Sequence, residues 1–264
     1  MNPTKPIIAA ILIAASLTSL PIPSLAQLDE PNNSNAEPTE ILFLLANPPL
    51  PTVGTPTTNR GTGTRGDCLY KPENPPLTNL DGEKNFELTV SAYPTFWVYV
   101  PYTSKEAPSG EFSLQDGEEE VYYANLSLPA TPGIVSISLP ATAKPLEVGK
   151  TYRWYFAINC HSSNSLDNFT QASVTGIVKI VSPSPELKEE LKNAQTPLQK
   201  IAAYAKHSIW YDTLTQLAQL RQNEPKNPTI EKLWVQLLSD ENIGLSNIAS
   251  QPISGAVITN SPQE

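Results

Sequence analysis

The sequence contains little of the chemistry that metal centres and nucleophilic active sites need. It has two histidines, two cysteines and one methionine among 264 residues. His161 and His207 form no His-x-x-x-His motif, and neither Cys-x-x-Cys nor Gly-x-Ser-x-Gly occurs. The dipeptide Cys160-His161 could be half of a metal site, but it has no recognisable second half. We therefore expect no cofactor, no metal and no catalytic activity.

Basic residues are also scarce. Lysine and arginine number 17 against 26 acidic residues, which gives a net charge of -9. Nucleic acids and anionic membranes attract positively charged surfaces, so both are excluded as expected partners.

No hydrophobic run is long enough to cross a membrane. The longest, residues 7–20, has about 14 residues, whereas a membrane helix needs about 20. Lys5 precedes this run, and helix-breaking Pro21 and the small residue Ala26 follow it. Residues 1–26 are therefore predicted to be a signal peptide, with an uncleaved anchor as the alternative. We expect an exported protein, periplasmic or extracellular, without stable membrane insertion after cleavage.

Export bears on the two cysteines, Cys68 and Cys160. In an oxidising compartment a single pair most simply forms a disulfide, and two unpaired thiols are the alternative. Closing a loop of about 90 residues would stabilise the fold by up to about 4 to 5 kcal/mol.

The stretch "RGTGTRGDC", residues 60–68, contains both a Gly-x-Gly-x-x-Gly pattern and an Arg-Gly-Asp tripeptide. A dinucleotide site needs a strand before the glycines and a helix after them. Proline-rich segments flank the stretch on both sides and exclude these elements. We interpret the glycines as residues that serve the backbone geometry at the start of a domain. We interpret the tripeptide as a chance match.

The chain divides into regions of different composition. Residues 27–59 are rich in proline, asparagine and threonine and are expected to be a disordered linker. Residues 60–182 contain short β-branched and aromatic runs such as "TFWVYVPY" and "TYRWYFAINC", which predict an antiparallel β-sandwich. Asp116-Gly117 is typical of a type I′ hairpin turn.

The segment "LEVGKTY" resembles the tyrosine corner of immunoglobulin and fibronectin type III domains. The Tyr152 hydroxyl is expected to bond to the loop that precedes it. Cys160 follows this tyrosine by eight positions, whereas antibody domains place their cysteine two positions after it. We therefore predict an immunoglobulin-like sandwich with its disulfide near the end of a strand.

Residues 183–252 change to helical periodicity. Ser184, Thr196 and Asn227 are predicted N-caps, and Thr196 begins a capping box with Gln199. The region is predicted to be a small helical hairpin that docks on the sandwich. Residues 253–264 are expected to be a flexible tail.

Part of this helical region resembles a tetratricopeptide repeat. The matching positions are Tyr204, Ser208, Leu217, Leu220 and Pro225. Thr213 departs from the pattern, which has alanine there, and only about one copy is present.

Taken together, "RGDC", "PTFWVYVPY", "EFSLQD", "TPGIVSISLP", "LEVGKTYRWYFAINC", "GIVKIVSPSPEL" and "SIWYDTLTQLAQLR" are similar to the exported cyanobacterial family called domain of unknown function 928. The resemblance covers about residues 60–252. It implies an extracytoplasmic setting and no known activity, catalytic residue or cofactor.

These observations favour a noncatalytic binding or scaffolding protein whose partner is an envelope protein or a peptide. The candidate contact residues are the aromatic side chains Trp97, Tyr99, Tyr122, Tyr123 and Trp210. A carbohydrate-binding sandwich of the cell envelope, with aromatic rings stacked on sugars, is the alternative. An envelope hydrolase that uses Asp116 and the acids at 118–120 is the third.

Overall fold

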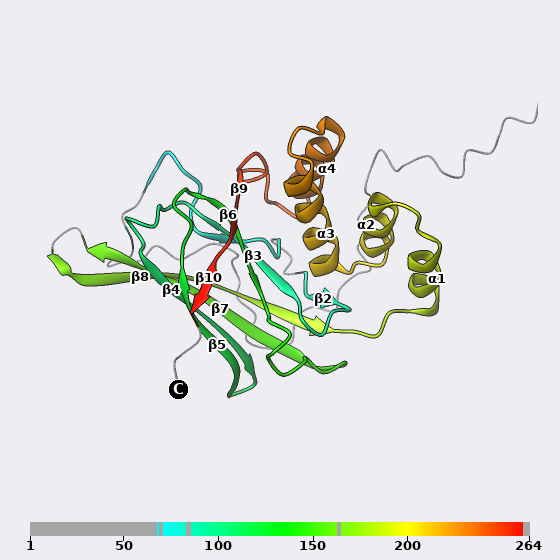
Figure 1. Ribbon diagram of the computed structural model, residues 1–264, viewed down its shortest axis with the longest axis horizontal. Coiled ribbons are helices and arrows are strands. Elements are labelled where there is room, and N and C mark those ends of the chain that lie inside the picture. Colours follow the sequence, from blue (N-terminus) through cyan, green and yellow to red (C-terminus); the bar gives the residue numbers. More distant parts are fainter. Residues whose placement is uncertain (1–67, 69–70, 83–85, 163–164, 261–264) are drawn as a thin grey trace, which may run out of the picture. The chain divides into compact units, whose positions relative to one another are not determined.

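The computed structural model describes residue 68 and residues 71–82, 86–162 and 165–260 (Figure 1). The predicted signal peptide, the predicted linker and the glycine-rich stretch before Cys68 lie outside the described residues. The described chain forms two mixed β-sheets followed by four helices, with two further short strands at the end. The predicted order, a β region and then a helical region, is confirmed.

The smaller sheet has four strands in the order β1-β3-β6-β9. They are β1 (Thr78–Asn79), β3 (Thr95–Val100), β6 (Gly133–Ser138) and β9 (Ile253–Ala256). The larger sheet has six strands in the order β10-β5-β4-β7-β8-β2. They are β10 (Ile258–Asn260), β5 (Glu119–Ser127), β4 (Ser109–Asp116), β7 (Thr151–Ser162), β8 (Ser165–Ile180) and β2 (Leu88–Thr89).

Neither sheet is purely antiparallel, so that part of the prediction is wrong. β9 pairs with β6 in parallel, and β2 pairs with β8 in parallel. Both parallel strands lie at sheet edges and reach their partners through long connections, which the short local strand pattern does not reveal. The other pairings are antiparallel.

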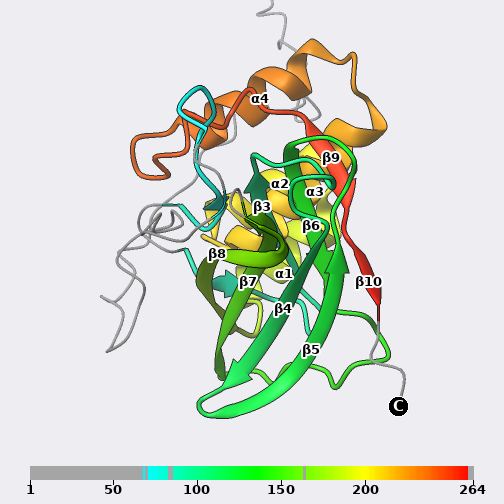
Figure 2. The same cartoon turned by 90° about the vertical axis from the view of Figure 1, so that its left-hand side faces the viewer.

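The segment expected to be a flexible tail completes both sheets instead. Ile253 pairs with Ile134 of β6, and Ile258 pairs with Ser127 of β5. Val257, between the two strands, is buried. Figure 2 shows this segment, in red, passing from β9 beside β6 to β10 beside β5. The sequence of this segment gives little local indication of a strand. The segment forms strands because it pairs with parts of the chain that are distant in sequence.

The predicted turn between β4 and β5 is of a different type in the structure, and the predicted hydrogen bond of Tyr152 is present. The β4–β5 turn contains Gly117 and Glu118, because Asp116 pairs with Glu119. Gly117 has a φ of 62° and Glu118 has no positive φ, which fits a type II′ turn and not the predicted type I′. The Tyr152 hydroxyl is bonded to the loop that precedes it, as predicted, since the backbone N–H of Glu147 donates to it at 3.1 Å.

The helices are α1 (Pro185–Asn193), α2 (Pro197–Lys206), α3 (Trp210–Asn223) and α4 (Pro228–Ser239). The side chains of Ser184, Thr196 and Asn227 cap three of them, and the Thr196 capping box is complete, as predicted. Ser208, between α2 and α3, has a φ of 58°. None of the described helices combines the length and apolar character needed to cross a membrane.

Both sheets and helices α2, α3 and α4 contribute to one large hydrophobic core, and Leu187, Ala203 and Ile209 form a second, smaller cluster. Figure 1 shows the helices on one side of the long strands, with α3 beside β2 and β3. Trp210 of α3 is buried and donates from its indole nitrogen to the backbone oxygen of Leu80 at 2.9 Å. A disulfide joins Cys68 to Cys160 of β7, which confirms the predicted pair and ties the first described residue to the larger sheet.

Candidate functional site

A buried polar cluster lies where α3 meets the larger sheet. The indole nitrogen of Trp154 donates to the Tyr211 hydroxyl at 2.9 Å, and this hydroxyl donates to the backbone oxygen of Ile177 at 2.9 Å. Trp154 and Tyr211 are both buried. The two bonds fix the first turn of α3 against β7 and β8.

Asp81 belongs to the same cluster and has an unusual environment. Its side chain is buried, and its Oδ2 atom has no hydrogen-bond partner. Burial raises its pKa well above the usual range, and the hydroxyl of Tyr211 and the indole of Trp154 offset only part of this rise. A methyl group at Gly176 would collide with Asp81 and with the Trp154 ring, so glycine makes the room for this carboxyl group. We interpret this closed cluster as structural.

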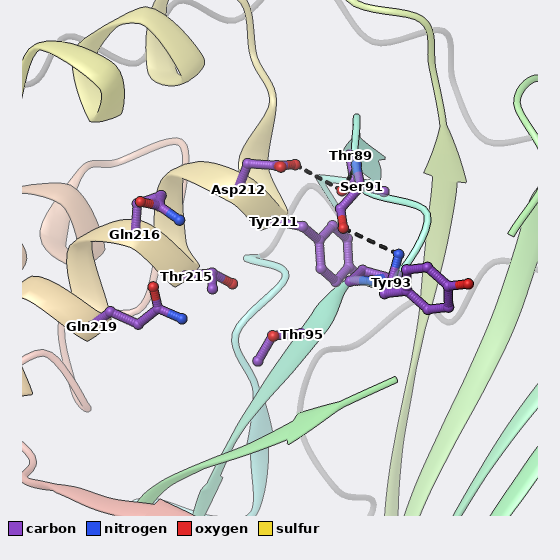
Figure 3. Close-up of a pocket in the computed structure, with 10 residues that line it drawn as sticks. Thr89, Ser91, Tyr93, Thr95, Tyr211, Asp212, Thr215, Gln216 and Gln219 are labelled. Atoms are coloured by element: carbon purple, nitrogen blue, oxygen red, sulfur yellow. Dashed lines mark hydrogen bonds between the residues drawn. The ribbon is translucent and has the colours of Figure 1, made fainter. Parts of the chain in front are cut away.

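An open pocket of about 210 Å³ lies next to the cluster (Figure 3). It is bounded on one side by the segment that joins β2 to β3 and on the other by one face of α3. Its lining consists of Thr89, Ser91, Tyr93, Pro94, Thr95, Tyr211, Asp212, Thr215, Gln216 and Gln219. Helical spacing places Asp212, Thr215, Gln216 and Gln219 on a single face of α3.

Asp212 supplies the negative charge of this pocket. Its Oδ2 accepts from the Thr89 hydroxyl at 2.7 Å and from the backbone N–H of Val90 at 3.1 Å. Burial raises the pKa of Asp212, and these two hydrogen bonds counteract the rise. Three residues further along, Thr215 accepts from the indole nitrogen of Trp97 at 3.0 Å. The carboxylate and the hydroxyl are therefore held in fixed positions.

The rest of the lining is uncharged, and most of it is polar. Gln216 and Gln219 are exposed, and in Figure 3 they extend from α3 beside Thr215. Ser91 accepts from the backbone N–H of Tyr93 at 3.1 Å, which shapes the opposite wall. No lysine, arginine or histidine is among the lining residues. The pocket can thus accept hydrogen bonds from a cation or an amide through one carboxylate and several hydroxyl and amide oxygens.

The structure places most of the predicted contact aromatics in the core. Trp97, Tyr99 and Trp210 are buried and present no surface to a partner, so their predicted role is wrong for this conformation. Helix α3 covers the side of β3 that carries Trp97, so this strand is buried on both faces and does not alternate. Tyr122 is half-buried and lies against Phe112.

Tyr123 is also half-buried, but it lies on the outer face of the larger sheet, opposite Ser113. Its hydroxyl lies 3.1 Å from both the Glu111 carboxylate and the Asn125 side-chain oxygen. The predicted contact residue that remains a candidate therefore lies on the outer face of the larger sheet, and not at the interface with the helices.

Two of the carboxylates considered for hydrolysis have other partners. Asp116 pairs with Lys150 at 2.9 Å, and Glu120 accepts from the Ser113 hydroxyl at 2.9 Å. Cys160 is bonded to Cys68, so it is not half of a metal site. Within the described residues, no group of three or more histidine, cysteine, aspartate or glutamate side chains could hold a metal ion.

Sequence reasoning missed the pocket residues. Gln216 and Gln219 have the spacing of an ordinary exposed helix face, and Ser91 lies in a short connection. Asp212 is only a weak indication of a site, since an acid in the first helical turn usually interacts with the helix dipole. Only the docking of α3 beside β3 brings these side chains together.

The architecture is that of a two-sheet β protein with a docked helical region and a polar pocket beside their junction. Residues 60–253 match the family model described as Domain of Unknown Function (DUF928), and the chain belongs to this family. Comparison with curated proteins and with solved structures gave no match.

Proposed function

We propose that this protein is an exported, noncatalytic binding protein whose pocket beside α3 receives a lysine or arginine side chain of a protein or peptide partner. The observation that carries the proposal is Asp212, a half-buried carboxylate in a lining without basic residues. A cation has a stronger electrostatic attraction to a partly desolvated carboxylate than to a fully solvated one.

The pocket dimensions fit this occupant. Small-molecule and cofactor sites occupy about 300 to 1,000 Å³, which exceeds the space available here. One long side chain with part of its backbone requires less volume than such a ligand. The exposed amides of Gln216 and Gln219 can bond to the flanking peptide groups, because each amide both donates and accepts.

Features of the fold support the same kind of role. The tyrosine corner at Tyr152 supports an immunoglobulin-like or fibronectin type III-like β region, a class that displays loops on a rigid base. The spacing across α2 and α3 supports a tetratricopeptide-like hairpin, whose relatives bind peptides.

Nuclear magnetic resonance with short blocked peptides tests the proposal. Peptides of alanine with a central lysine or arginine are titrated into the isotope-labelled protein, and a central glutamine serves as the reference peptide. The basic peptides are expected to shift the backbone signals of Thr89, Val90 and Gln216. Asp212→Asn should abolish the shifts, whereas Glu241→Gln, at an exposed acid elsewhere, should leave them unchanged. Equal shifts with the glutamine peptide would contradict the proposal.

A further inference from the structure

The outer face of the larger sheet carries an ordered arrangement of side chains distinct from the pocket. In the strand register, Tyr123 of β5 lies opposite Ser113 of β4, which lies opposite Tyr155 of β7. The phenol rings start from strands that are two spacings apart, or about 10 Å. Tyr155 is 37% exposed, one of the largest exposed apolar side chains of the described chain.

Hydrogen bonds hold the polar groups beside these rings. One oxygen of the Glu111 carboxylate lies 3.1 Å from the Tyr123 hydroxyl, and the other accepts from the Gln171 amide at 3.1 Å. The same amide nitrogen lies 3.3 Å from the side-chain oxygen of Asn159. Glu111 therefore links β5, β4 and β8 through side chains alone. We call Tyr123, Ser113, Tyr155, Glu111, Gln171 and Asn159 the tyrosine face.

A polar outer face is the ordinary state of an antiparallel sheet, and alternation alone would produce one. The tyrosine face differs from that state in two ways. Two tyrosines share one cross-strand row, where a solvated surface has no need of aromatic rings. The polar groups around them are bonded to each other, so that their positions are set before a ligand arrives.

The charge of the tyrosine face selects among ligands. Its six residues carry one carboxylate and no basic group. Glu120 accepts from the Ser113 hydroxyl and adds a second carboxylate beside the face, and Arg153 lies in the neighbouring row. An anionic polymer or a membrane would be repelled by Glu111, whereas hydroxyl groups can donate to its carboxylate and accept from the Gln171 amide. Sugar rings have apolar C–H faces that pack on phenol rings, and their hydroxyls lie at the rim of the ring.

We propose that the tyrosine face binds a neutral polysaccharide laid across the strands, with sugar rings stacked on Tyr155 and Tyr123 and hydroxyl groups bonded to Glu111 and Gln171. The separation of the two tyrosine positions is comparable with the repeat of an extended disaccharide. This site is independent of the pocket beside α3, so either assignment can fail alone.

Co-sedimentation with cellulose, curdlan and starch granules tests the site. At least one of these neutral polymers is expected to retain the folded protein. Tyr155→Ala should weaken this retention by about tenfold, because the stacking surface is lost. Tyr155→Phe should preserve it, since the ring remains. Val148→Ala removes an exposed apolar side chain outside the tyrosine face and should have no effect.

Three results would overturn the proposal. One is that none of the three polymers retains the folded wild-type protein. Another is that Tyr155→Ala is retained as well as the wild type while its thermal unfolding is unchanged. The third is stronger binding to polygalacturonate than to any neutral polymer, which would mean that an anion is recognised.

Discussion

Trp154 of β7 and Tyr211 of α3 meet through a hydrogen bond of 2.9 Å between the indole nitrogen and the phenol oxygen. Because the Tyr211 hydroxyl donates a hydrogen bond to the Ile177 carbonyl, the phenol joins two strands of one sheet to helix α3. The polar junction lies inside the hydrophobic core, where an unmade hydrogen bond is expensive.

Tyr211→Phe is therefore expected to destabilise the fold by about 1 to 3 kcal/mol, since the variant leaves a buried N–H and a buried carbonyl without a partner. Urea unfolding followed by tryptophan fluorescence measures the change. Tyr155→Phe removes a hydroxyl from the exposed face and should cost much less. Equal unfolding midpoints for the two variants would contradict the bridging role of Tyr211.

Asp81→Asn should increase the free energy of unfolding at neutral pH and reduce its dependence on pH. Burial raises the pKa of Asp81, so the folded protein holds this proton more tightly than the unfolded chain does. Stability from this group is fully present below about pH 4, the unfolded pKa, and is lost as the pH rises through the raised folded pKa. The asparagine amide does not titrate.

The difference between the unfolding free energies of wild type and Asp81→Asn, measured from roughly pH 5 to 9, isolates this contribution from other titrating groups. Asp212 and Glu87 also have raised pKa values, but they are the same in both proteins. A difference that stays constant over this interval would show that Asp81 has the same proton affinity in both states.

Cys68→Ser should lower thermal stability markedly, because the unfolded chain regains the freedom of a long loop. The two cysteines are 92 positions apart. Loss of the link is expected to cost up to about 4 to 5 kcal/mol. Calorimetry with and without a reductant tests this, since reduction should bring the wild type close to the variant. Two free thiols in denatured, unreduced protein would contradict the bond.

Deletion of residues 253–264 should prevent stable folding. The deletion removes one edge strand from each sheet and exposes the backbone of β5 and β6 to other chains. Size-exclusion chromatography and circular dichroism should show aggregation or loss of the cooperative transition. Deletion of residues 261–264 alone keeps β9 and β10 and is the control. A monomeric and stable 1–252 protein would show that these strands are dispensable.

Features that depend on neighbouring residues were predictable from the sequence. The Thr196 capping box and the Ser184 and Asn227 caps need only the first turn of each helix. The tyrosine corner likewise joins Tyr152 to a loop a few residues upstream. The disulfide followed from having a single pair of cysteines in a chain that is predicted to be exported.

Features that depend on distant packing were not predictable. Trp97 and Tyr99 lie on a strand covered on both faces, so alternation could not tell which aromatic residues would be exposed. The pocket requires α3 to lie beside β3, and no local pattern encodes that placement. The parallel pairing of β9 with β6 depends in the same way on a partner far away in the chain.

The two sheets are complete only when β9 and β10 have paired, so these strands also determine when the protein can fold. Before residues 253–260 pair, β5 and β6 each lack an outer neighbour. Pairings of such long range form slowly, because a large loop must be closed before any contact rewards it. Until that loop closes, the edges of β5 and β6 stay open to pairing with another chain, so folding and aggregation compete for the same backbone groups.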